Sequence, residues 1–235
     1  KDSSIRIGLD LVAQKKADAF VSAGNSGAVA SGALFMLKRI KGIERPAIAA
    51  VMPTIKGHVV VIDAGANTAV KPFNLVQFAI MSSVYCKYAV QTKNPKISIL
   101  SNGEEDIKGT DAIREANGLL KNSSLNYIGY VEGSDVFRGN ADVVVCDGFT
   151  GNVLLKVAEG VAESVGKVLK REIQSSYMAR LGYLFARNAF NNLKKKFDYA
   201  EYGAAPLLGV TAPVFIAHGK SNAIAIKNAI QTAKR

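Results

Sequence analysis

Short loops of Gly, Asn, Asp and Ser follow five apolar runs of this 235-residue chain, and they carry the residues best suited to chemistry. The loops span 23–27, 63–67, 101–105, 146–152 and 218–222. Small residues leave backbone N–H groups accessible, and a helix that starts after each loop adds the positive end of its dipole. The loops therefore favour binding of an anion such as a phosphate or a carboxylate.

Two longer side chains belong to this region. Lys108 follows the third loop, and Asn152 ends the fourth. A lysine ammonium suits contact with an anion, and an asparagine amide can donate to a carbonyl oxygen as negative charge develops there. Each also has a plain structural explanation, because lysines are commonly solvated and asparagines commonly cap helices.

The loops supply the other candidates for binding an anionic substrate. Any single loop is better explained as a turn, since Asn and Gly tolerate positive φ. Five loops in equivalent positions shift the balance toward a binding site. The candidate residues are Gly24, Asn25, Ser26, Gly27, Asp63, Gly65, Asn67, Asp147, Gly148, Thr150 and Gly151.

The elements that must position these loops form an alternation of strands and helices. The apolar runs 18–22, 59–62, 97–100, 142–145 and 214–217 are continuous, as expected of parallel strands covered on both faces. Parallel strands release their loops at the carboxyl ends, so we expect all five loops at one edge of a doubly wound, mostly parallel α/β sheet. A further strand is expected over 127–131, and helices over 4–16, 28–39, 72–88, 111–120 and 153–173.

Composition is that of a soluble globular protein, with 49% hydrophobic and 21% charged residues. No apolar run approaches the roughly 18 residues of a membrane-spanning helix. Cys86 and Cys146 lie in apolar stretches and predict buried, reduced thiols rather than a disulfide or a nucleophile. His58 and His218 have no Cys or His at ligand spacing, so no metal site is predicted.

Several enzyme classes lack their motif in this chain. None of the loops fits the G-x-G-x-x-G dinucleotide pattern, and no G-x-S-x-G nucleophile elbow is present. Residues 219–221 (Gly-Lys-Ser) resemble the end of a P-loop, but Val214 occupies the position of its first glycine. We therefore predict neither a dinucleotide site nor a P-loop.

The net charge of +11 is concentrated in one segment. Residues 167–198 hold eight Lys and Arg against Glu172 and Asp198, which implies an acidic partner. Within it, 174–198 predicts a protruding amphipathic helical element that packs on a second subunit, rests on an anionic membrane, or does both. Its candidate contact residues are the apolar Leu181, Leu184 and Phe185 and the basic Arg180, Arg187 and Lys194.

Several long stretches carry a family resemblance that extends in collinear order over essentially the whole chain. They are 21–28 (VSAGNSGA), 39–47 (RIKGIERPA), 63–67 (DAGAN), 71–72 (KP), 75–81 (LVQFAIM), 141–152 (ADVVVCDGFTGN) and 202–209 (YGAAPLLG). In these stretches the chain closely resembles the bacterial phosphate acyltransferases of phospholipid synthesis.

The resemblance implies a doubly wound α/β/α fold of the type found in isocitrate and isopropylmalate dehydrogenases and phosphotransacetylases. It implies one catalytic domain over 1–235 that lacks the N-terminal segment of the family, including a Met-Gly-Gly-Asp loop next to the site. The implied activity moves a long fatty acyl group from acyl carrier protein to inorganic phosphate, without a cofactor. In this family Lys108 and Asn152 match the residues implicated in catalysis.

The resemblance also implies partners and a location. The protein is expected to be a cytoplasmic homodimer that associates peripherally with an anionic membrane and supplies acyl phosphate to a membrane glycerol-3-phosphate acyltransferase. Nucleic acid is not an expected partner, because the basic segment carries no known reader motif. Two alternatives stay open: a short-chain phosphotransacetylase that uses acyl-CoA, and a membrane- or nucleic-acid-binding module without catalysis.

From these residues we predict a mechanism of positioning and charge placement. Asn25, Asn67 and the backbone amides of the 24–27 and 148–152 loops hold phosphate, with Lys108 as the counter-ion. Asn152 donates to the thioester oxygen.

Overall fold

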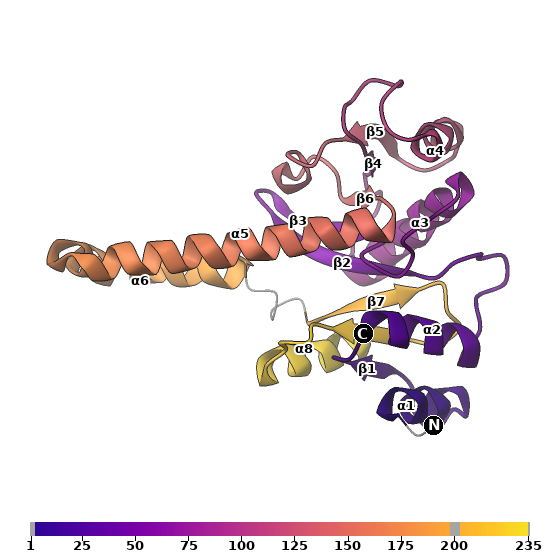
Figure 1. The fold of residues 1–235 in the computed structure, drawn as a ribbon, viewed down its shortest axis with the longest axis horizontal. Helices are drawn as coiled ribbons and strands as arrows, with labels where there is room; N and C mark the ends of the chain where they lie inside the picture. Colours follow the sequence, from indigo (N-terminus) through magenta and orange to yellow (C-terminus); the bar gives the residue numbers. More distant parts are fainter. Residues whose placement is uncertain (1–2, 198–202, 235) are drawn as a thin grey trace.

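The computed structural model describes residues 3–197 and 203–234, and in them helices pack on both faces of a mixed, eight-stranded sheet (Figure 1). The sheet has the order β1-β8-β7-β2-β3-β6-β4-β5. Its strands are β1 (Phe20–Ser22), β2 (Ala47–Thr54), β3 (Gly57–Ile62), β4 (Ile97–Leu100), β5 (Tyr127–Val131), β6 (Val143–Val145), β7 (Ala204–Leu208) and β8 (Val214–Ala217). The helical segments are α1 (Ser4–Ala13), α2 (Ser26–Met36), α3 (Pro72–Tyr85), the π-helix η1 (Cys86–Val90), α4 (Asp111–Lys121), the 3₁₀-helix η2 (Val136–Arg138), α5 (Gly148–Ser175), α6 (Tyr177–Phe197) and α8 (Ala223–Lys234).

The six strands expected from the sequence are confirmed, but two further strands change the direction of the sheet. β1 is parallel to β8, and β3, β6, β4 and β5 form a second parallel group. Between the groups, β7 and β2 are antiparallel to each other and to their outer neighbours. β1 and β8 therefore run opposite to β3, β6 and β4.

This reversal corrects one expectation. The loops that follow β3, β4 and β6 lie at one edge of the sheet, whereas the loops after β1 and β8 leave from the opposite edge. The prediction that all five loops share an edge is thus wrong for 23–27 and 218–222. Its physical cause is the pair of antiparallel strands, which the sequence reading did not recognise.

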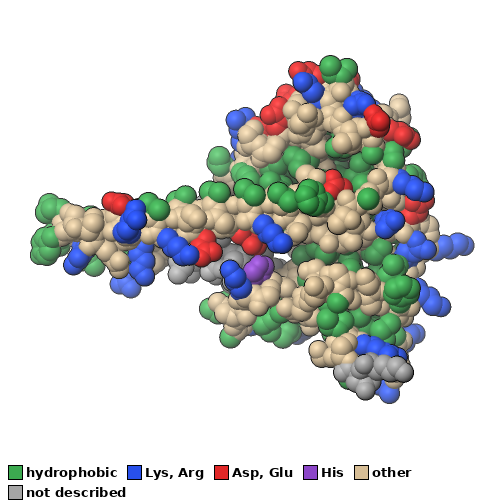
Figure 2. All heavy atoms as spheres, viewed as in Figure 1, with side chains coloured by type: hydrophobic (Ala, Val, Ile, Leu, Met, Phe, Trp, Pro, Cys, Tyr) green, Lys and Arg blue, Asp and Glu red, His purple; other side chains and the backbone are tan. Residues whose placement is uncertain are grey.

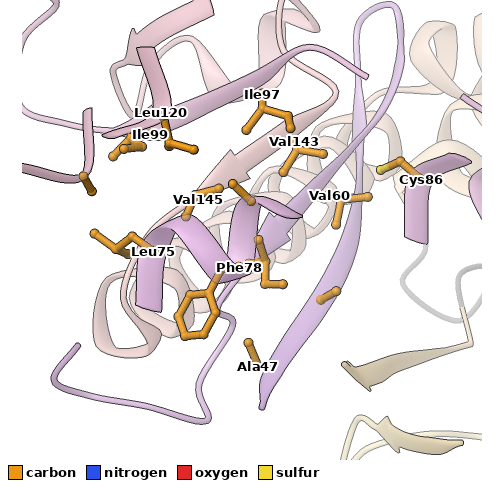
Figure 3. Packing of buried hydrophobic residues seen from close by; sticks show 14 of the residues in the cluster. Ala47, Val60, Leu75, Phe78, Cys86, Ile97, Ile99, Leu120, Val143 and Val145 are labelled. Atoms are coloured by element: carbon orange, nitrogen blue, oxygen red, sulfur yellow. The ribbon is translucent and has the colours of Figure 1, made fainter. Parts of the chain in front are cut away.

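Central strands bury both of their faces, which explains their continuous apolar sequence. Val60 and Ile62 of β3 pack with Phe78 of α3, whereas Val59 and Val61 face the opposite side of the sheet. Phe78 and Leu75 of α3 lie in one buried cluster with residues of the strands and with Leu120 of α4 (Figure 3). The two core clusters fix α3 and α4 on one face and the first turns of α5 on the other.

The β1–β8–β7 end of the sheet has its own core under α1 and α2. Val29 and Ala33 of α2 pack with Leu9 of α1 and with Ile216 of β8. Ala64, just after β3, belongs to the same cluster, so α2 reaches from its own loop to the loop after β3.

Helix α5 begins at the sheet and extends far beyond the body, where α6 returns alongside it (Figure 1). This hairpin corresponds to the protruding element expected over 174–198, although α5 starts at Gly148 rather than 153. Residue 198 lies outside the described residues, as does the side chain of Lys194. Within the described part of the chain, no helix combines the length and apolar character needed to cross a membrane.

The two thiols are buried and free, as predicted. Burial raises the pKa of the Cys86 thiol to about 12, and it raises the pKa of the Cys146 thiol well above its usual value. Since a thiolate is the nucleophilic form, neither residue is suited to nucleophilic catalysis at neutral pH.

Candidate active site

The carboxylate of Asp63, immediately after β3, organises the edge of the sheet where three of the loops meet. Its side chain is fully buried and accepts five hydrogen bonds. Oδ1 accepts from the backbone amides of Ile48, Gly65 and Ala66 at 3.0–3.2 Å. Oδ2 accepts from the amide and the side chain of Asn67 at 2.7 and 2.8 Å. The loop 63–67 is therefore wrapped around this carboxylate and tied to the start of β2.

These bonds bear on the roles expected for Asp63 and Asn67. The Asn67 side chain is buried and also donates to the carbonyl of Pro46 at 2.7 Å, so both of its N–H groups have acceptors. It would have to leave Asp63 and Pro46 in order to donate to phosphate. Burial raises the pKa of the Asp63 carboxyl, while its hydrogen bonds lower it in part. Both residues hold the loop together here, and their predicted contact with substrate stays a prediction.

Helix α5 docks its first turn directly on this loop. The amide of Gly148 donates to the carbonyl of Asn67 at 2.7 Å. A Cβ on Gly151 would lie 2.0 Å from the carbonyl oxygen of Asp63, and a Cβ on Gly148 would lie 2.7 Å from its Oδ2. Glycine is thus required at both positions by the close approach of helix and loop.

Asp147 caps α5 and accepts hydrogen bonds from Thr150, a residue of the loop that was predicted to hold phosphate. Its Oδ1 accepts from the amide of Thr150 at 2.9 Å, and its Oδ2 accepts from the hydroxyl of Thr150 at 2.6 Å. The amide of Gly151 donates to the carbonyl of Asp147. The amides of Gly148, Thr150 and Gly151 therefore all have partners within the protein, and the prediction that this loop holds phosphate stays a prediction.

Asn152 lies on the exposed side of this turn, against Gly65. Gly65 has φ +135°, a conformation that favours glycine, and a Cβ there would lie 3.6 Å from Cβ of Asn152. The Asn152 side chain is half-buried and makes no hydrogen bond with any described residue. Its amide is thus held beside the loop 63–67 with its donors free.

Lys108 belongs to a loop that is anchored on both sides. Asp106 accepts from Lys121 at 2.6 Å and from Asn117 at 3.2 Å. Gly109 donates to Asn102 at 2.8 Å and accepts from Arg114 at 2.6 Å. The half-buried Lys108 side chain lies over Gly103 and has no hydrogen-bond or ion-pair partner among the described residues.

A cavity of about 180 Å³ lies between the elements that carry Lys108 and Asn152. Thr110, Ala112 and Ile113 line it from the start of α4, and Asp147 lines it from the start of α5. Residues 68–70 and Leu75 complete the wall. The structure therefore brings the two loops to one cavity, although neither Lys108 nor Asn152 is itself part of its lining.

The loop 24–27 lies apart from this edge. Asn25 caps α2, because its Oδ1 accepts from the amide of Ala28 at 2.9 Å, and the atoms nearest to Gly24 belong to Ser22 and Ile5. The amides of Ser26 and Gly27 donate to no described residue, so this helix start keeps free N–H groups. Its link to the cavity edge is the apolar cluster that α2 shares with Ala64.

One supporting set of residues was missed from the sequence. The connection between α2 and β2 is held by Asn74 and Gln77, two buried amides on α3. The available signal was the three-residue spacing of Asn74 and Gln77 on a helix face that is otherwise apolar.

The model of a family described as fatty acid synthesis protein matches residues 1–235. The chain belongs to this family. A phosphate acyltransferase from Geobacter sulfurreducens is 58% identical over 233 residues, covering 99% of this chain and 67% of that protein. A phosphate acyltransferase from Pelobacter propionicus is 53% identical, covering 100% of this chain and 68% of that protein. The chain thus spans about two thirds of the length of these family members.

Solved structures confirm the α/β fold of the family member. A phosphotransacetylase from Streptococcus pyogenes has a TM-score of 0.66 at 23% identity and covers 97% of this chain and 65% of its own. EutD phosphotransacetylase from Staphylococcus aureus has a TM-score of 0.63 at 18% identity, covering 98% and 67%. At these identities the likeness concerns the fold alone.

The substitution Asp63→Asn tests the organising role of the carboxylate. Whichever oxygen the new NH₂ group replaces, it faces two or three N–H donors, so buried donors lose their acceptor. We expect the free energy of unfolding to fall by roughly 3 kcal/mol or more, measured by urea denaturation. Asp18→Asn, at an exposed carboxylate, is the control and should change stability by less than about 0.5 kcal/mol. Equal unfolding midpoints for the two variants would contradict the assignment.

Proposed function

We propose that this protein transfers a long-chain fatty acyl group from acyl carrier protein to inorganic phosphate, forming acyl phosphate for phospholipid synthesis. The observation that carries the proposal is the 53–58% identity, over 99–100% of the chain, to proteins named phosphate acyltransferase. In support, Lys108 and Asn152 have side chains without partners among the described residues, and each lies close in sequence to residues that line one cavity.

The reaction needs no cofactor and little proton transfer. An oxygen of hydrogen phosphate attacks the thioester carbonyl, the new C–O bond forms, and the C–S bond breaks. The remaining phosphate proton passes to the departing thiolate, so the products are acyl phosphate and the free thiol of the carrier. Phosphate is already nucleophilic near neutral pH, so the protein must position it and stabilise the charge that develops on the carbonyl oxygen.

Lys108 and Asn152 fit these two tasks. The Lys108 ammonium has no carboxylate partner among the described residues and can neutralise the incoming phosphate. The Asn152 amide can donate to the carbonyl oxygen, from a position fixed by the packing of α5 on Gly65.

An assay with the purified protein and two acyl donors tests the proposal. We expect acyl phosphate, trapped with hydroxylamine, to form from long-chain acyl carrier protein in proportion to added phosphate. In the same assay, Lys108→Ala and Asn152→Ala should each lower turnover at saturating phosphate by roughly 10²–10³-fold, as loss of one preorganised donor usually does. Lys93→Ala and Asn94→Ala, at exposed positions away from the cavity, are the controls.

Different outcomes of this assay favour different functions. Preference for short-chain acyl-CoA would indicate a phosphotransacetylase. If neither donor gave product, the protein would be a binding module without catalysis. Turnover within about threefold of wild type for Lys108→Ala and Asn152→Ala would contradict their assigned roles.

We infer that the hairpin of α5 and α6 rests on an anionic membrane. Several apolar side chains of α6 are strongly exposed: Tyr177, Met178, Leu184 and Phe185. Exposed Arg180 and Arg187 lie among them, and Leu181 is half-buried. Apolar side chains next to basic ones suit the interface of an anionic bilayer, and the hairpin projects far enough to reach one (Figure 1).

Flotation with phosphatidylglycerol vesicles measures this association. The combined variant Arg180→Ala, Arg187→Ala should bind roughly tenfold more weakly or worse, since each basic residue contributes about 1 kcal/mol near such a surface. Phe185→Ser should weaken binding further, whereas Phe35→Ser, also strongly exposed but on α2, should not. If none of the Arg180, Arg187 and Phe185 substitutions weakened vesicle binding, the result would contradict the proposed membrane contact.

We also propose that α5 pairs with a second copy of the chain. A row of exposed valines follows the helix at intervals of about four residues, and it appears as a line of apolar side chains in Figure 2. The row consists of Val153, Val157, Val161, Val165 and Val168, each 44–60% exposed. A continuous apolar stripe of this length is rare on the surface of a monomer.

The dimer is tested by the mass of a variant in solution. Val161→Glu places a charge in the middle of the row and should convert a dimer to a monomer in light scattering. Val84→Glu, on an exposed position of α3, should leave the mass unchanged. A wild-type protein that is monomeric at micromolar concentration would contradict the proposal.

A further inference from the structure

The connection between α2 and β2 carries a second concentration of positive charge, separate from the hairpin. It holds four exposed cations, and Lys71 at the start of α3 adds a fifth. In Figure 2 lysine and arginine side chains gather at this side of the molecule. We name the set the α2–β2 basic patch: Lys38, Arg39, Lys41, Arg45 and Lys71.

Buried amides hold the backbone of this patch in place. Gln77 donates to the carbonyl of Gly42 at 2.7 Å and accepts from the amide of Glu44 at 2.9 Å. Asn74 donates to the carboxylate of Glu44 at 2.8 Å and accepts from the amide of Lys71 at 2.9 Å. Asn74 and Gln77 are 1% and 5% exposed, so their polar groups would be costly without these bonds.

The same bonds leave the charge of the patch unbalanced. Glu44 is its one carboxylate, and it is bound to Asn74. None of the five cations forms an ion pair with a described residue; Arg39 donates to the backbone carbonyl of Glu44. The positive charges therefore face solvent from a fixed loop.

The patch is connected directly to the candidate active site. Pro46 accepts from Asn67, and Ile48 donates to Asp63, so the connection ends on the loop that supports Asn152. Ile40 and Phe73 are 48% and 50% exposed and add apolar surface among the cations. The hairpin projects from the opposite side of the molecule (Figure 1).

We propose that the α2–β2 basic patch is the docking surface for an acidic partner protein, the carrier that brings the acyl thioester to the site. This inference rests on the proposed function. A rigid surface with unpaired cations and a small apolar component complements an acidic protein helix. A membrane is the less suitable partner, because the hairpin that suits it points away.

Charge complementarity of this kind acts mainly on encounter, so the patch should affect KM and salt dependence more than kcat. Lys41 and Arg45 are the positions to change, because neither side chain makes a hydrogen bond with a described residue. Their reversal should leave the folded loop intact.

The test compares Lys41→Glu, Arg45→Glu with a control of equal charge, Lys93→Glu, Lys227→Glu, at exposed sites elsewhere. At low salt we expect the patch variant to lose at least tenfold in kcat/KM with acyl carrier protein, with kcat within twofold. Transfer from a small acyl thioester without a carrier should be unchanged, and the control should match wild type with both donors.

Other results would overturn the proposal. Equal losses with the carrier and the small thioester would show a role in the site itself, and no loss with either would show that the carrier docks elsewhere. Weaker vesicle flotation with normal carrier kinetics would make the patch a membrane contact. Binding of the unacylated carrier, measured by calorimetry, separates this inference from the proposed function: lost binding in the patch variant supports docking even if wild type forms no acyl phosphate.

Discussion

The buried carboxylate of Asp63 is the constraint on which the site edge depends. One charged group collects donors from the start of β2 and from the whole of the loop 63–67. A carboxylate removed from water is tolerated only when its lone pairs accept hydrogen bonds. The need to supply these donors fixes the conformation of the loop 63–67. The carbonyls left on the outside of this loop, those of Asp63 and Asn67, then form the surface that receives α5.

The requirement for glycine on α5 follows from that arrangement. Because the loop presents backbone oxygens rather than side chains, the helix approaches to a distance that excludes a Cβ at Gly148 and Gly151. Close docking in turn fixes the rotation of the first turn and directs Asn152 toward Gly65. Buried polar chemistry, helix placement and the orientation of the candidate catalytic amide are consequences of the same interaction.

Much of the fold could be predicted because continuous apolar runs indicate strands that are covered on both faces. Val59 to Ile62 alternate between two cores, so every residue is apolar, and the parallel group around β3 was expected correctly. β2 and β7 were not expected, since Ala and Pro, which are uncommon in strands, make up much of their sequences (AIAAVMPT and AAPLL). Their tertiary position in the middle of the sheet overrides this weak propensity.

The site was harder to predict, because the same residue types serve as ligands and as structural anchors. Asn25 and Asp147 cap helices, Asn67 binds Asp63, and local sequence does not distinguish these roles from contact with phosphate. Lys108 and Asn152 were suggested by chemistry and assigned through resemblance, and neither side chain has a partner among the described residues. Whether a donor stays free for substrate depends on long-range contacts, such as the hydrogen bond from Asn67 to Pro46. No local sequence pattern contains such contacts.

Helix α5 connects the proposed activities mechanically. Its first turn positions Asn152, its middle carries the valine row, and its last turns form the hairpin with α6. At 1.5 Å per residue, a helix of 28 residues spans roughly 40 Å without a hinge. A membrane or second subunit that holds the far end of α5 therefore also fixes the orientation of the site. The α2–β2 basic patch then stays on the side away from the hairpin, where a soluble acidic partner can reach it. The anionic membrane and the acidic carrier would therefore not compete for the same cations.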